Sequence, residues 1–178
     1  MSRSQLTSTD QQNSGGPVSP YVAGKNKIIN GDFGIWQRGT TFNSVANNSY
    51  TADRFYVAWD SSPTVNVTQQ TFAPGTAPVT GYESAYFFRL TETATSSSTV
   101  ADVRYRIEDV RTFAGQTATL SWWAKADSAR TMTIAAINQD FGSGGSVAVT
   151  VTPTTSSFNL TTSWQRFSTT VTFPSIAG

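Results

Sequence analysis

The stretch that decides the fold is Asn26-Lys-Ile-Ile-Asn-Gly-Asp-Phe-Gly-Ile-Trp-Gln-Arg-Gly39, followed by Tyr50-Thr-Ala-Asp-Arg-Phe55. It predicts a β-strand over residues 27–36 that turns on its glycines and carries Phe33 and Trp36 into a core. It also marks a boundary, because residues 1–25 hold almost no large apolar side chains and nearly all the aromatic residues follow. We therefore expect an extended polar arm over residues 1–25 and one β domain over residues 26–178.

The arm has a composition that cannot bury enough apolar surface to offset its ordering entropy. We expect it to gain a fixed shape only along a partner. Tyr21 and Val22 are its first side chains suited to anchoring it on that partner.

The composition of the whole chain favours strands. It contains 28 Thr and 22 Ser, and only 13% of its 178 residues are charged. Threonine, valine and aromatic residues fit a pleated, half-buried surface better than a helix. A chain of this length can bury roughly 70% of its unfolded surface, enough for one domain with a core.

Short strand patterns separated by turn clusters run through the domain, and no segment sustains a helical period. The arrangement is typical of an all-β sandwich or jelly roll. The expected strands are 27–36, 53–59, 64–70, 85–91, 99–109, 116–125, 130–138, 146–152 and 164–173.

Period-two alternation assigns the faces of several strands. Val103 and Tyr105 fall on one face, opposite Arg104 and Arg106. Phe167, Val171 and Phe173 share a face of the last strand. In 117–125, Ala118, Leu120, Trp122 and Ala124 point one way, and we expect Trp123, among polar neighbours, to lie outside the core.

Several kinds of chemistry are excluded or disfavoured. The chain has no Cys and no His, which removes disulfides, thiolate nucleophiles, and histidine bases and metal ligands. Its net charge of +1 gives no electrostatic case for nucleic acid or an anionic membrane. The first ten residues lack a signal-peptide pattern and no stretch reaches membrane-spanning length, which predicts a soluble protein made in a cytoplasm.

Several separated motifs, in order, resemble a β-jelly-roll domain common in virion proteins of tailed bacteriophages. They are Lys27-Ile-Ile-Asn-Gly-Asp-Phe-Gly-Ile-Trp-Gln-Arg-Gly, Tyr50-Thr-Ala-Asp-Arg-Phe, Arg106-Ile-Glu-Asp-Val-Arg, Leu120-Ser-Trp-Trp-Ala-Lys-Ala, Asn138-Gln-Asp-Phe-Gly-Ser-Gly-Gly and Trp164-Gln-Arg-Phe. The family is similar to carbohydrate-binding modules of the galactose-binding-like jelly-roll type. It occurs in tail fibres and other appendages.

This resemblance implies a virion structural protein made in the cytoplasm of the bacterial host. It implies partners among the tail, adaptor or capsid proteins, and a homo-oligomer, with a homotrimer as the first expectation. The chain stops soon after the strand at 164–173, whereas relatives tend to continue. We therefore expect either a longer native protein or a partner that covers the sheet edge. Adhesion to host-surface glycans is the alternative role.

Three residues are the carbohydrate-binding candidates. Trp123 and Trp59 offer flat apolar surfaces for the C–H face of a sugar ring, and Lys125 adds a polar group beside Trp123. Coverage by the arm or by a neighbouring subunit is the alternative explanation for such tryptophans. Trp36, Trp122 and Trp164 lie in patterned segments, and we expect them to pack in the core.

The remaining candidates receive structural interpretations. We expect the adjacent Asp53 and Arg54 to form an ion pair or a hydrogen-bonded corner. Asp32 with nearby carbonyls is a weak candidate for a structural Ca²⁺ site, and no other cofactor is expected. The mixed charges around Arg104 and Arg106 indicate a solvated or interface face. No pair of carboxylates has a spacing that signals catalysis, so we expect no enzymatic activity.

Overall fold

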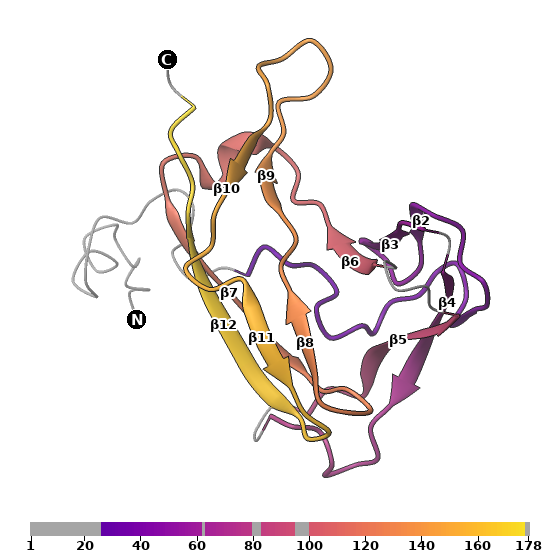
Figure 1. Cartoon of the computed structure of the whole chain (residues 1–178). Helices are drawn as coiled ribbons and strands as arrows, with labels where there is room; N and C mark the ends of the chain where they lie inside the picture. Colours follow the sequence, from indigo (N-terminus) through magenta and orange to yellow (C-terminus); the bar gives the residue numbers. More distant parts are fainter. Residues whose placement is uncertain (1–25, 62, 80–82, 95–99, 177–178) are drawn as a thin grey trace, which may run out of the picture.

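The structure is a computed structural model that describes residues 26–61, 63–79, 83–94 and 100–176 (Figure 1). Within these ranges it contains twelve β-strands, one 3-10 helix at Val110–Phe113 and no α-helix. All the strand pairs are antiparallel. The prediction of an all-β sandwich class is therefore confirmed.

Two three-stranded sheets form the N-terminal half of the domain. One has the order β1-β4-β5 and the other has the order β2-β3-β6. Their strands are β1 (Thr41–Phe42), β2 (Ser49–Tyr50), β3 (Phe55–Trp59), β4 (Thr64–Thr71), β5 (Tyr86–Ala94) and β6 (Ala101–Tyr105).

Three antiparallel strand pairs form the C-terminal half. In sequence, each pair is enclosed by the next, which is the pairing pattern of one long hairpin. The outermost pair is β7 (Thr117–Ala124) with β12 (Gln165–Thr172). Inside it lie β8 (Arg130–Thr133) with β11 (Ser157–Leu160), and then β9 (Ile137–Gln139) with β10 (Val149–Val151). Figure 1 shows the pairs β7–β12 and β8–β11 on one side of the domain, with β9–β10 above them and the strands of the N-terminal half on the other side.

The core centres on a cluster of four buried valines, Val45, Val57, Val65 and Val67. Val65 and Val67 alternate with more exposed residues along β4, because period two sends every second side chain inward. Each buried valine contributes roughly 1.5–3 kcal/mol relative to exposure. Partly buried hydrophobic side chains, Trp36, Phe42, Trp59, Phe88, Leu90 and Ala101, pack around the cluster.

The prediction of a strand over 27–36 is wrong. Asn30 and Phe33 have φ angles of 60° and 56°, in a left-handed region that an extended strand excludes. Phe33 nevertheless reaches aromatic partners, with its ring centroid 4.9 Å from that of Phe55. The segment is an irregular turn that carries its aromatic side chains inward without a strand.

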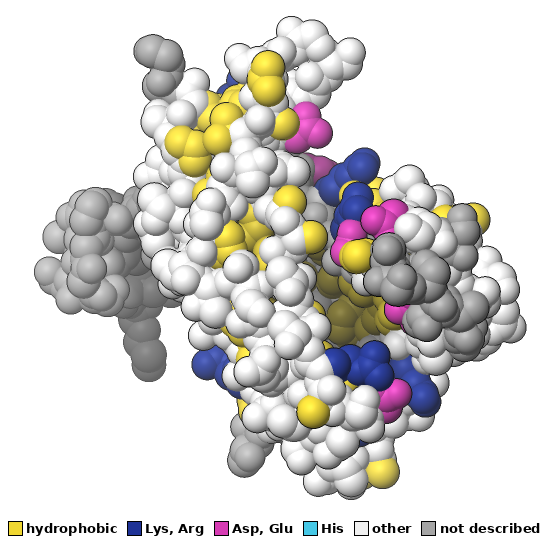
Figure 2. All heavy atoms as spheres, in the orientation of Figure 1, with side chains coloured by type: hydrophobic (Ala, Val, Ile, Leu, Met, Phe, Trp, Pro, Cys, Tyr) yellow, Lys and Arg dark blue, Asp and Glu magenta, His cyan; other side chains and the backbone are white. Residues whose placement is uncertain are grey.

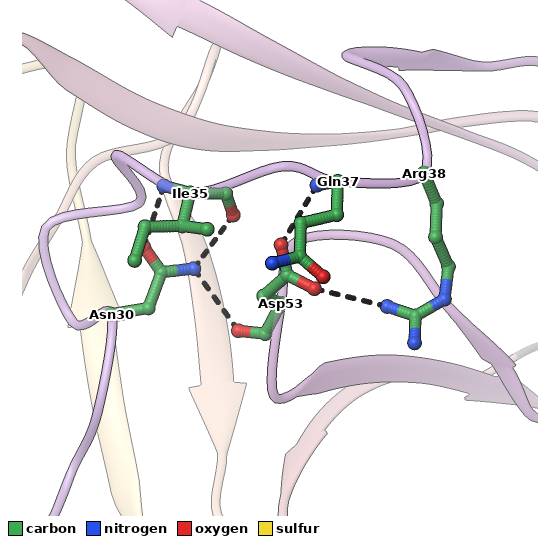
Figure 3. Close-up of polar contacts among 5 residues, drawn as sticks. All are labelled: Asn30, Ile35, Gln37, Arg38 and Asp53. Carbon is green, nitrogen blue, oxygen red and sulfur yellow. Dashed lines mark hydrogen bonds and ion pairs between the residues drawn. The ribbon is translucent and has the colours of Figure 1, made fainter.

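Side chains supply the hydrogen bonds that a strand partner would otherwise give this segment (Figure 3). The Asn30 Nδ2 donates to the carbonyls of Ile35 and Asp53 at 2.9 and 3.0 Å, and its Oδ1 accepts from the Ile35 N–H at 2.8 Å. The Asp53 carboxylate accepts from the Gln37 N–H at 2.8 Å and pairs with Arg38 at 3.1 Å. This corner ties residues 30–38 to the turn before β3.

Other strand boundaries differ in smaller ways. The expected strand 130–138 divides into β8 and β9, and the expected strand 99–109 ends at Tyr105 before the 3-10 helix. The strands β1, β2 and β11 were not predicted. Two of these have only two residues each, which is too short for a period-two pattern to reveal.

Candidate functional site

The alternation of β7 separates its two adjacent tryptophans, as predicted. Side chains from Thr117 to Ala124 alternate strictly between exposed and partly buried. Trp122 points inward, where its ring centroid lies 4.9 Å from that of Phe158 and 6.1 Å from that of Phe167. Trp123 points outward and is 37% exposed.

The outward side of the β7–β12 pair is a surface of hydroxyl groups, which we call the hydroxyl face. In the register of the pair, Ser168 lies opposite Ser121, and Thr170 lies opposite Thr119. At one end the hydroxyls of Thr117 and Thr172 are 3.0 Å apart. The face consists of Thr117, Thr119, Ser121, Trp123, Arg166, Ser168, Thr170 and Thr172.

Positive charge lies beside Trp123. Arg166 stands directly opposite it across the pair, and its Nη2 donates to the Ser121 hydroxyl at 3.3 Å. Lys125 follows the end of β7, with its Nζ 5.5 Å from the centroid of the Trp164 ring. A flat apolar ring among hydroxyl and guanidinium donors can hold a hydroxylated ring or a polar protein surface.

The structure does not bring Trp59 to this face. Trp59 lies at the end of β3, packs against the valine cluster and donates its indole N–H to the Val45 carbonyl at 3.0 Å. The indole N–H is therefore already satisfied, and β3 belongs to a different sheet from β7. Of the three candidates, Trp123 and Lys125 lie near one another in the chain and Trp59 stands apart.

The tryptophans assigned to the core are packed as expected. Trp36 stacks near Phe88 with 5.8 Å between ring centroids. Trp164 contacts Phe72 and Phe87, with 5.3 Å between centroids in each case. Aromatic packing thus accounts for both positions.

The expected corner at Asp53 is present, but Asp53 and Arg54 do not pair with each other. Asp53 binds Arg38, and Arg54 binds Glu108 at 2.6 Å. Hydrogen bonding to Glu108 is the main cause that raises the pKa of Arg54. Asp32 is exposed, and its carbonyl accepts from the Ser84 hydroxyl at 3.2 Å.

A pocket that the sequence analysis did not predict lies beside the β2-β3-β6 sheet. It is lined by Tyr50, Arg54, Arg106 and Glu108. The charge pattern around Arg106 and Glu108 was visible in the sequence. The contribution of Tyr50 was not, because β2 has only two residues and pairs with β3 through Tyr50 opposite Tyr56.

The remaining expectations concern the N-terminal arm, a bound metal ion and a membrane-spanning segment. The arm residues Tyr21 and Val22 fall outside the described ranges. In the described part of the chain, no group of three or more acidic, Cys or His side chains is placed to hold a metal ion. No helix in that part is long and apolar enough to cross a membrane.

Comparisons with protein-family models, with curated proteins and with solved structures found no match to this chain.

Proposed function

We propose that this chain is a structural protein of a tailed-bacteriophage virion, a component of a tail fibre or another appendage. Residues 1–25 attach it to a neighbouring virion protein, and the β domain makes contacts through the hydroxyl face. The role consists of binding and includes no chemical step. The ordered set of motifs from Lys27 to Trp164 supports the virion context, and the all-β architecture agrees with it.

The observation that carries the role of the β domain is the exposure of Trp123 on an otherwise polar surface. Aromatic and arginine side chains are enriched at the centres of protein interfaces, and the surrounding rim is polar. The hydroxyl face has this composition, with Trp123 and Arg166 adjacent among serines and threonines. Loss of a central interface tryptophan typically costs about 2 kcal/mol or more, roughly a thirtyfold loss of affinity.

An oligomer on a particle would multiply weak contacts through effective concentration. We propose a homotrimer, on the basis of the family resemblance. Sedimentation equilibrium of the full chain would test this, with a trimer mass expected and a monomer mass at all concentrations as the contrary result.

Deletion of residues 1–20 tests the attachment role. The shortened chain should melt within a few degrees of the full chain, because the corner and the valine cluster lie outside the deletion. It should nevertheless fail to enter particles when it replaces the full chain. A matched control replaces residues 1–20 with a Gly/Ser segment of equal length, and it should fail equally. Normal incorporation of either variant would refute the attachment role.

A second role, recognition of host-surface glycans, is favoured by the combination of the Trp123 ring with hydroxyl and guanidinium donors. A glycan array should then show binding that is lost in Trp123→Ala and largely kept in Trp123→Phe. Val147→Ala is the control, because Val147 is 89% exposed and belongs to the connection between β9 and β10, outside the residues of the hydroxyl face. An array without signal, together with a hydroxyl face covered by another virion protein, would favour the purely structural role.

A further inference from the structure

The pocket beside the β2-β3-β6 sheet has the features of a small binding site. Its volume is about 230 Å³. This is smaller than the roughly 300–1,000 Å³ of sites for drug-sized ligands, so it suits one small group. Arg54, one of its walls, has a φ of 74°, a strained conformation that non-glycine residues seldom adopt and that is often found at ligand sites. Figure 2 shows Lys and Arg side chains gathered with Asp and Glu beside the hollow between the two halves of the domain.

Two arginines of this region, Arg38 and Arg106, lie over tyrosine rings. The rings of Tyr50 and Tyr56 are 5.3 Å apart. The Arg106 guanidinium lies 4.8 Å from the Tyr56 centroid, and that of Arg38 lies 5.6 Å from the Tyr50 centroid. A guanidinium held by its face keeps N–H groups on its edge for a planar acceptor. A hydrogen bond with Tyr56 is the main cause that raises the pKa of Arg106.

Among the described residues, the positive charge of Arg106 is not balanced by a nearby carboxylate. The neighbouring arginines each have an acidic partner: Arg38 with Asp53 at 3.1 Å, Arg54 with Glu108 at 2.6 Å, and Arg104 with Asp102 at 2.7 Å. In the described part of the chain, Arg106 has no carboxylate within ion-pair distance, and Asp140 exerts only a minor long-range attraction on it. A ligand with one negative charge would therefore balance the charge of Arg106 in this pocket.

Two further lining residues, Glu108 and Tyr50, indicate which other chemical groups the ligand has. Glu108 is held by Arg54 through one oxygen, and its side chain remains 80% exposed. Its other oxygen can accept a hydrogen bond from a ligand hydroxyl, and its charge disfavours a doubly charged anion such as phosphate. Tyr50 is 40% exposed and offers an apolar ring with a hydroxyl group. A ligand that matches Arg106, Glu108 and Tyr50 has one carboxylate, several hydroxyls and an apolar face.

We infer that this pocket binds an acidic monosaccharide unit, with its carboxylate on the Arg106 guanidinium, a hydroxyl on Glu108 and its ring against Tyr50. The site belongs to a different sheet from the hydroxyl face and does not depend on Trp123. A single sugar in so small a site should bind with a Kd on the order of 1 mM.

The test is an NMR titration of the full chain, labelled with ¹⁵N, with galacturonate, galactose, acetate and inorganic phosphate. Galacturonate should shift the Arg106 side-chain resonance and bind at least about tenfold more tightly than galactose or acetate. Arg106→Ala should weaken galacturonate binding about tenfold or more, because a charged hydrogen-bond partner is lost. Arg106→Lys should recover part of the affinity, since it keeps the charge and loses the planar fork.

A control variant separates this site from general charge effects. Arg130→Ala, at an exposed arginine paired with Asp127, should leave galacturonate binding unchanged. Amide spectra of each variant report whether its fold is intact. Equal affinity for galactose and galacturonate, equal or tighter binding of phosphate, or full affinity in a folded Arg106→Ala variant would each overturn the assignment.

Discussion

Asn30 provides the most quantitative test of how the N-terminal segment is held. Asn30 is 8% exposed, and its carboxamide makes three hydrogen bonds to Ile35 and Asp53. At about 1 kcal/mol net for each bond, their loss costs about 3 kcal/mol. The φ of 60° adds about 1 kcal/mol for alanine, which tolerates this region less well than asparagine. We therefore predict that Asn30→Ala lowers the free energy of unfolding by about 4 kcal/mol.

A loss of that size is a large share of the 5–15 kcal/mol that stabilises a typical domain. At roughly 2–4 °C for each kcal/mol in a chain of this length, the melting temperature should fall by about 8–16 °C. Urea denaturation followed by tryptophan fluorescence gives the free energy directly, provided that the m-value is unchanged.

Asn48 is a matched control for the backbone contribution. It also has a φ of 60°, but its side chain is exposed. Asn48→Ala should cost only about 1 kcal/mol, the left-handed penalty alone. Asn30→Gly should cost about 3 kcal/mol, because it removes the bonds and relieves the strain. Equal losses in Asn30→Ala and Asn48→Ala would refute the reasoning, because the side-chain bonds would then contribute nothing.

Three further predictions concern the core, a surface ion pair and the exposed tryptophan. Val57→Ala should lower the free energy of unfolding by roughly 2–3 kcal/mol in the same urea assay, because Val57 is fully buried and the mutation leaves a cavity. Arg130 is the main cause that lowers the pKa of Asp127, so Arg130→Ala should raise that pKa in a carbon-detected NMR titration. The stabilisation from this ion pair is present above the ordinary pKa of a carboxyl group and is lost as the pH falls through the lowered pKa of Asp127. An Asp127 titration that is unchanged in Arg130→Ala would contradict the pairing. Trp123→Ala should change the melting temperature by no more than a few degrees, since no core contact is lost, and a large fall would assign Trp123 to the core.

The long strands and the faces of their side chains were predictable from the sequence. Alternation over eight residues put Trp122 and Trp123 on opposite faces, and the polar neighbours of Trp123 identified it as the outward one. The same rule explains why Val65 and Val67 of β4 are both buried, although only the strand itself was predicted. The local sequence pattern is sufficient to predict the orientation of side chains where one face of a long strand is buried.

The failures share a different physical cause. Residues 27–36 have a strand-like composition, but Asn30 takes a left-handed conformation because its carboxamide bonds to groups as distant as Asp53. The pocket depends on the alignment of Tyr50 with Tyr56 and on Arg54 meeting Glu108. The contacts of Asn30 with Asp53 and of Arg54 with Glu108 join residues far apart in the chain, and no local period encodes them.

Thiol labelling at the hydroxyl face tests the central claim, that the β domain makes its contacts through this surface. The chain has no native cysteine, so Thr119→Cys places a single thiol on the face and Ser143→Cys places one on an exposed loop as the control. Both thiols should react at similar rates in the isolated protein. We predict that only the thiol at position 119 is protected in assembled particles, or in particles attached to host cells. Equal reactivity of both thiols in all three states would contradict the claim.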